Sequence, residues 1–129
     1  MNALTPGFKP LLDKIEKEGQ CLDGGILKVD SFINHQIDPV LLEEMSSEFV
    51  RRFKDLKITK VMTIEASGIA PAAMVGLLLK VPVVFAKKKK PSTMADMYTT
   101  EVFSFTKNTT YTICCAREFL KKDDSIDII

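Results

Sequence analysis

The chain has 129 residues, of which 46% are hydrophobic and 27% are charged, and this is the composition of an ordinary globular protein. Its length suits one domain with one core. Eighteen basic and seventeen acidic residues leave a net charge of +1, which argues against nucleic acid or a membrane surface as a partner.

The N-terminal part of the chain predicts a helix, a turn and a short strand. Apolar residues at positions 11, 12 and 15, followed by Gly19, predict a short amphipathic helix that ends at the glycine. Gly24 and Gly25 mark a turn, and the strand is expected over Ile26–Val29.

A second helix is predicted from Asp38 and Pro39, because aspartate caps free amides and proline is tolerated in the first helical turn. The apolar residues that follow recur at three- and four-residue spacing and give one apolar stripe. They are Leu41, Leu42, Met45, Phe49 and Phe53.

A βαβ unit is predicted next. Val61–Ile64 is a short apolar run that follows Lys57 and Lys60, which we expect to be exposed, and it is typical of a buried strand. A tight turn at residues 65–68, a helix over Ala72–Leu79 and a second strand over Val81–Phe85 complete the unit. Such a unit requires a right-handed crossover, so we expect two adjacent parallel strands at the centre of a sheet.

The C-terminal part predicts a loop, a hairpin and a last strand. Residues 91–99 have no sustained apolar period and are expected to form a mobile surface loop. Glu101–Phe105 and Tyr111–Ala116 are expected to pair as an antiparallel hairpin, and Ser125–Ile129 begins another apolar strand.

The cysteines predict an intracellular setting. Cys21, Cys114 and Cys115 are odd in number and have no C-x-x-C spacing, so neither a disulfide framework nor a zinc site is expected. Since Cys114 and Cys115 alternate across a strand, at most one should face a core, and we interpret both as structural. No apolar run has signal-peptide or membrane-span length, so we expect a soluble cytoplasmic protein.

The turn at residues 65–68 is the main candidate site. It lies between a strand end and a helix start, where backbone amides converge on an anion, although an ordinary tight βα turn would have the same sequence features. Ser67 is not expected to be a hydrolase nucleophile, because Glu65 stands where G-x-S-x-G needs glycine. Lys87–Lys90 could bind phosphates or form a solvated face, and His35 is interpreted as structural.

Taken in order, these segments resemble one family. Leu27–Pro39 closely resembles the base-binding region of bacterial xanthine phosphoribosyltransferases, and Thr63–Pro71 resembles the pyrophosphate loop of the same family. Val81–Lys89 and Val102–Lys107 resemble its second strand and its flexible hairpin. The resemblance extends from about Leu12 to the last residue.

The resemblance implies a fold and a reaction. The fold is α/β and type I phosphoribosyltransferase-like, with a mostly parallel sheet flanked by helices and a small N-terminal hood over the purine. The family transfers ribose 5-phosphate from phosphoribosyl pyrophosphate to xanthine in purine salvage, giving XMP and pyrophosphate. It does so with Mg²⁺ that is bound through the donor, and its members are homodimers. Residues 1–129 are then the N-terminal part of a single domain of this kind.

The resemblance also implies site residues. Leu27 and Asn34 match positions that contact xanthine, and an amide can both donate to and accept from an oxo-purine. The positions that match the donor and pyrophosphate site are Glu65, Ala66, Ser67, Gly68, Lys87 and Lys88. No metal ligand is expected in this chain, and its catalytic residues remain unassigned.

The sequence departs from the family at its C-terminus. In the family, the strand that matches Ile126–Ile129 continues into two acidic residues and an Ala-Asn-Gly loop that holds the donor's 5-phosphate and ribose. A later lysine that contacts the purine also lies beyond Ile129, and Asp127 replaces an apolar residue of a buried strand. We therefore expect a C-terminally truncated enzyme that is inactive by itself. The alternatives are a non-catalytic purine-binding or dimerising module and an inert fragment.

Overall fold

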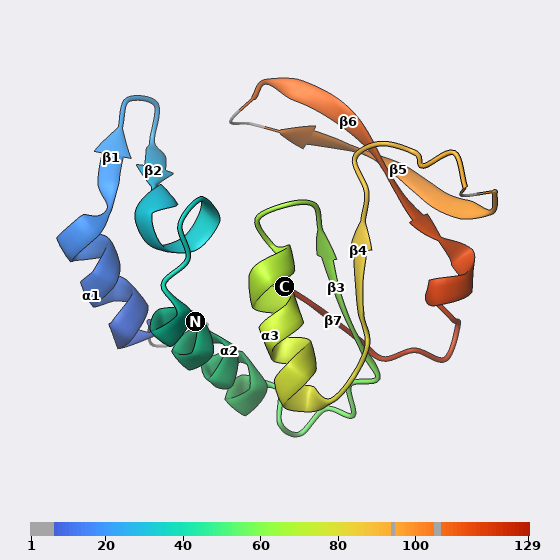
Figure 1. Cartoon of the computed structure of the whole chain (residues 1–129), viewed down its shortest axis with the longest axis horizontal. Helices are drawn as coiled ribbons and strands as arrows, with labels where there is room; N and C mark the ends of the chain where they lie inside the picture. Colours follow the sequence, from blue (N-terminus) through green and yellow to red (C-terminus); the bar gives the residue numbers. More distant parts are fainter. Residues whose placement is uncertain (1–6, 94, 105–106) are drawn as a thin grey trace, which may run out of the picture.

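The computed structural model describes residues 7–93, 95–104 and 107–129. Helices cover a small parallel sheet, and two antiparallel hairpins lie on either side of it in Figure 1. Phe105 and Thr106, which belong to the predicted hairpin, lie outside the described residues. Within the described ranges, no helix has the length and apolar character needed to cross a membrane.

The N-terminal elements form a separate layer. Helix α1 (Lys9–Glu18) ends at Gly19 as predicted, and strands β1 (Gln20–Leu22) and β2 (Ile26–Lys28) pair antiparallel. Gly24 and Gly25 have φ of 80° and 76°, so glycine meets the need for left-handed backbone in this turn. Strand β1 was not predicted from the sequence, because three residues are too few to show a period.

A π-helical turn and a second helix follow. The turn η1 (Asp30–Asn34) buries Phe32, which is 2% exposed. Helix α2 (Pro39–Arg52) begins as predicted, since an Asp38 carboxylate oxygen accepts hydrogen bonds from the amides of Val40 and Leu41, both at 3.1 Å.

The parallel sheet confirms the predicted βαβ unit. Strands β3 (Lys60–Ile64) and β4 (Val83–Ala86) are parallel neighbours, and helix α3 (Ile69–Leu79) connects them. Strand β7 (Ile126–Ile128) pairs parallel with the other edge of β3, which gives the order β4-β3-β7. The prediction that both strands are central is correct for β3 and wrong for β4, because β4 forms the edge of this three-stranded ladder.

The core lies between α3 and the sheet. Val61, Ala72 and Val75 are fully buried, and side chains from α2 pack against them. A Cβ at Gly76 would overlap Val83 Cγ2, so this glycine permits close contact between α3 and β4.

The second hairpin is longer than the sequence predicted. Strand β5 (Met97–Ser104) pairs antiparallel with β6 (Thr109–Ala116) along its whole length. The prediction of a loop over residues 91–99 is therefore wrong for Met97–Thr99. These residues lack an apolar period, but they gain backbone hydrogen bonds from β6. A short 3-10 turn η2 (Arg117–Phe119) follows β6.

Candidate functional site

The loop between β3 and α3, residues 65–68, is held at the carboxyl end of the sheet. The Glu65 amide donates to the carbonyl oxygen of Ala86 at 3.0 Å, and a Glu65 carboxylate oxygen accepts from the Lys88 amide at 2.8 Å. The Glu65–Ala66 peptide is cis. These contacts fix the first residue of the loop to the segment that leaves β4.

The remaining amides of this loop are available to a ligand. Within the described part of the chain, the backbone amides of Ala66, Ser67 and Gly68 donate to no acceptor. Ala66 and Ser67 are exposed, and Gly68 immediately precedes α3. Unpaired amides before a helix N-terminus form a site for an anion such as phosphate, because both the amides and the helix dipole present positive charge.

Gly68 is required by close packing rather than by an unusual φ angle, since its φ is −73°. A Cβ at this position would overlap the Thr63 hydroxyl oxygen and would lie 3.4 Å from the Ile64 carbonyl oxygen. Thr63 is 3% exposed and β-branched, so its side chain has little freedom to move away.

The lysines after β4 lie between this loop and the second hairpin. The amide and the carbonyl of Lys87 exchange hydrogen bonds of 2.8 and 2.9 Å with Cys114 on β6. Lys88 is anchored through its amide to Glu65, while its Nζ lies 5.3 Å from the centroid of the Tyr111 ring. The sequence left open whether these lysines form a solvated face. The structure brings the backbone of Lys88 to the loop at residues 65–68, whereas Lys87 Nζ lies 5.6 Å from the centroid of the Phe85 ring.

The residues expected to contact a purine lie in the N-terminal layer. Leu27 is on β2 and is 45% exposed, and Asn34 is the exposed last residue of η1. In Figure 1 this layer is on one side of the β3–α3 loop and the β5–β6 hairpin is on the other. Leu27 and Asn34 therefore lie on other elements than the loop at residues 65–68, and their contact with a purine stays a prediction.

The two cysteines of β6 are both buried, which differs from the sequence prediction. Cys114 and Cys115 are 3% and 4% exposed, so the expectation that at most one faces a core is wrong. Cys114 Sγ lies 3.5 Å from the Lys87 carbonyl oxygen, and Cys115 is buried on the other side of the strand, where desolvation raises the pKa of its thiol. Both faces of β6 are therefore covered at this end.

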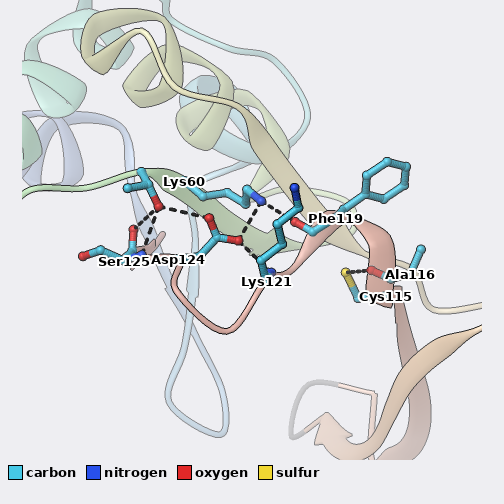
Figure 2. Close-up of polar contacts among 8 residues, drawn as sticks. Lys60, Cys115, Ala116, Phe119, Lys121, Asp124 and Ser125 are labelled. Carbon is cyan, nitrogen blue, oxygen red and sulfur yellow. Dashed lines mark hydrogen bonds and ion pairs between the residues drawn. The ribbon is translucent and has the colours of Figure 1, made fainter.

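A polar network fixes β7 beside β3 (Figure 2). Lys60 Nζ lies 2.8 Å from an Asp124 carboxylate oxygen, and their side chains are 11% and 12% exposed. The other Asp124 oxygen accepts from the Thr59 hydroxyl, and the Lys121 amide also donates to Asp124. The hydrogen bond to Lys60 is the main reason that the pKa of Asp124 is lowered to about 2. The prediction that Lys60 is exposed is wrong, because its partner lies 64 residues away in sequence.

Asp127 lies in the middle of β7 and is 7% exposed. The apolar neighbours of Asp127 predicted a buried strand here, and its burial agrees with that prediction. Its carboxylate has no ion pair within the described residues. Desolvation raises the pKa of this group, and a hydrogen bond from the Ile128 amide opposes the change. The carboxylate therefore opposes folding at neutral pH.

Comparison with known proteins places these features in context. The chain matches no family model. It is 52% identical over 123 residues to proteins named xanthine phosphoribosyltransferase from Levilactobacillus brevis, Ligilactobacillus salivarius and Listeria monocytogenes. The matched region is 95% of this chain and 64% of each relative, so the chain spans somewhat less than two thirds of their length.

Solved structures share the fold at low sequence identity. The adenine phosphoribosyltransferase of Giardia lamblia, in complex with 9-deazaadenine, superposes with a TM-score of 0.72 at 18% identity, over 92% of this chain and 65% of that one. The enzyme of Rhodothermus marinus gives a TM-score of 0.70 at 18% identity, over 94% of this chain and 69% of that one. The predicted α/β fold is therefore confirmed as that of the type I phosphoribosyltransferases.

Proposed function

We propose that this chain, which has the phosphoribosyltransferase fold and is homologous to xanthine phosphoribosyltransferases over 95% of its length, forms the base and pyrophosphate sites of such an enzyme. The reaction is transfer of ribose 5-phosphate from phosphoribosyl pyrophosphate to xanthine. A bond forms between N9 of xanthine and C1 of the ribose, the C1–oxygen bond to pyrophosphate breaks, and the proton of N9 is lost.

The free amides of the loop at residues 65–68 are the observation that carries this proposal. Ala66, Ser67 and Gly68 present unpaired donors at the N-terminus of α3, where negative charge is most stabilised. Negative charge accumulates on the departing pyrophosphate as the C1–oxygen bond breaks. Amides that are already oriented stabilise that charge without reorganisation, which lowers the barrier.

The base is assigned to the N-terminal layer. Leu27 would pack against the purine ring, and the Asn34 amide would donate to and accept from the oxo groups of xanthine. Lys87 and Lys88 would add positive charge beside the pyrophosphate. No group of three or more His, Cys, Asp or Glu side chains is placed to hold a metal within the described ranges. As the resemblance to the family implies, Mg²⁺ would enter as a complex with the donor.

The biological setting follows from the same homology. We assign the chain to purine salvage in the cytoplasm and to a homodimer, in agreement with its near-neutral charge and its exposed apolar side chains. A purely non-catalytic purine-binding module is less well supported, because the 52% identity extends over 123 residues, 95% of this chain, and is shared with proteins that are named as enzymes.

The test is XMP formation from xanthine and phosphoribosyl pyrophosphate with Mg²⁺. The 129-residue chain is compared with a fusion in which the remaining C-terminal part of the Levilactobacillus brevis relative follows Ile129. We expect the fusion to make XMP and the chain alone not to do so at an enzymic rate, since positioning of both reactants contributes roughly 7–11 kcal/mol. Equal rates for the two proteins would show that the donor site is misplaced, and a folded fusion without activity would contradict the proposed reaction.

A further inference from the structure

One lysine of α1 contacts two other segments of the N-terminal layer. Lys14 Nζ lies 2.9 Å from a carboxylate oxygen of Glu18, one turn later on α1, and 2.9 Å from one of Asp38. It also lies 5.8 Å from the centroid of the Phe32 ring, within the range in which a cation is attracted to an aromatic face. A single ammonium group thus connects α1 to η1 and to the residue that caps α2.

The two carboxylate oxygens of Asp38 have different contacts. Oδ1 accepts the hydrogen bonds from the Val40 and Leu41 amides that cap α2, whereas Oδ2 faces Lys14. The hydrogen bond from Lys14 is the main reason that the pKa of Asp38 is lowered, so this carboxylate is charged at neutral pH. The contact with Lys14 can therefore be removed by a substitution that keeps the cap.

Asp38 also closes the backbone around η1. Its amide donates to the Phe32 carbonyl oxygen at 3.0 Å, and the Gln36 amide donates to the Asp30 carbonyl oxygen at 2.8 Å. Both hydrogen bonds span Asn34, the residue of η1 that is assigned to the base. The Phe32 side chain is 2% exposed, so this turn is anchored by a buried ring as well as by its backbone.

A second ion pair on α1 provides a contrast. The pair of Lys9 and Asp13 has the same four-residue spacing and a distance of 2.6 Å, but its side chains are 81% and 56% exposed. The side chains of Lys14 and Asp38 are 24% and 30% exposed. An exposed pair within one helix contributes little to stability. Lys9 pairs within α1, whereas Lys14 pairs with another segment and can restrict the position of that segment.

We infer that Lys14 is a positioning residue of the base site, which holds η1 between α1 and α2 and thereby sets the place of the Asn34 amide for hydrogen bonds to the oxo groups of xanthine. Lys14 acts through η1 and does not itself contact the base. Affinity depends on this placement, because hydrogen bonds weaken steeply when their angle is poor. The inference rests on the proposed function, since it takes Asn34 to be the group that contacts the oxo groups.

The first measurement is amide hydrogen exchange of the 129-residue chain, followed by NMR. Lys14→Met keeps a long apolar side chain and removes the charge. It should speed exchange at the Gln36 and Asp38 amides roughly threefold or more, because the hydrogen bonds of these amides close the backbone around η1. This readout does not depend on any ligand.

The second measurement is calorimetric titration of the same chain with xanthine and, in parallel, with unsubstituted purine. Lys14→Met should weaken xanthine binding roughly three- to tenfold, the range expected when one hydrogen bond is impaired. It should leave the affinity for purine nearly unchanged, because purine has no oxo group for Asn34 to contact. A general loosening of the layer would weaken both ligands equally, so the ratio of the two affinities separates positioning from a purely structural role.

Three further variants serve as controls. Lys9→Met removes the other paired lysine of the same helix and should change neither exchange nor affinity. Lys14→Arg keeps a charge that can bond both carboxylates and lie over the ring, so it should restore the wild-type affinity for xanthine. Asp38→Asn keeps an oxygen for the α2 cap but loses the charge that faces Lys14, so it should weaken xanthine binding as Lys14→Met does. The two substitutions together should cost no more than either alone, since they remove the same contact.

The possible failures of the inference and of the proposed function are distinguishable. Wild-type exchange and wild-type xanthine affinity in Lys14→Met would overturn the inference and leave the proposed function standing. An equal loss of affinity for xanthine and purine would overturn it as well. If the wild-type chain bound neither base, the assignment of the purine to the N-terminal layer would fail, and the inference would fail with it.

Discussion

Gly68→Ala is the substitution with the sharpest expected effect on the loop at residues 65–68. The added Cβ would overlap the hydroxyl oxygen of Thr63, which is 3% exposed and cannot move into solvent. Overpacking of this kind costs about 1–3 kcal/mol of the free energy of unfolding. Because Gly68 stands at the start of α3, relief of the overlap must also displace its amide, so we expect pyrophosphate affinity to fall together with stability.

Urea unfolding and calorimetric titration with pyrophosphate measure the two effects. Thr63→Ala removes the hydroxyl oxygen that the new Cβ would meet, so the double variant should regain part of the stability lost in Gly68→Ala. The double-mutant cycle should therefore give a coupling free energy of about 1 kcal/mol or more. A Gly68→Ala protein with the wild-type unfolding midpoint and wild-type affinity would refute the packing argument, and strict additivity of the two substitutions would exclude Thr63 as the cause.

Two further predictions concern β7 and its anchor. The pKa of Asp124 is about 2 in the folded chain against a usual 3.8, so its contribution to stability is present above pH 4 and lost as the pH falls toward 2. Lys60→Met should therefore flatten this part of the pH profile of stability, as measured by urea unfolding. An unchanged profile would contradict the assigned ion pair. The pKa of Asp127 is raised by burial, so its charged form destabilises the folded chain at neutral pH. Asp127→Val should therefore raise the free energy of unfolding by about 1–3 kcal/mol at pH 7. This gain should shrink as the pH falls toward 3.8 and the wild-type carboxyl becomes neutral. A destabilised Asp127→Val protein at pH 7 would show that this carboxylate has a partner.

Local signals in the sequence predicted the elements that build the parallel sheet. The carboxylate of Asp38 caps α2. The order of strand, tight turn, helix and strand from Lys60 to Ala86 requires a right-handed crossover between parallel strands. These features depend on residues that are near one another in sequence. They were therefore visible without knowledge of the tertiary structure.

Features that depend on distant partners were not predicted. Met97–Thr99 have no strand period, and they are ordered as a strand by pairing with Cys114–Ala116. Lys60 has the sequence context of an exposed residue, but Asp124 and the connector before β7 cover it. In both cases the stabilising contact comes from a segment that the local sequence does not specify.

The sequence predicted the candidate site only in part, because some of its contacts also come from distant segments. The loop at residues 65–68 has a recognisable position between a strand and a helix, and the lysines after β4 could be named as donor-site candidates by resemblance. The approach of Lys88 and Lys107 to the Tyr111 ring depends on how the hairpin folds over the end of β4. A lysine run alone does not distinguish such an arrangement from a solvated surface.

The most direct test of the account is a pyrophosphate titration of the ¹⁵N-labelled 129-residue chain, followed by the chemical shifts of its backbone amides. We expect the amides of Ala66, Ser67 and Gly68 to move with a common dissociation constant, because these donors are unpaired in the free chain. Smaller changes should reach Lys88 through its contact with Glu65. If pyrophosphate left these loop amides unmoved while it shifted resonances elsewhere, the leaving-group site would not be at the β3–α3 loop.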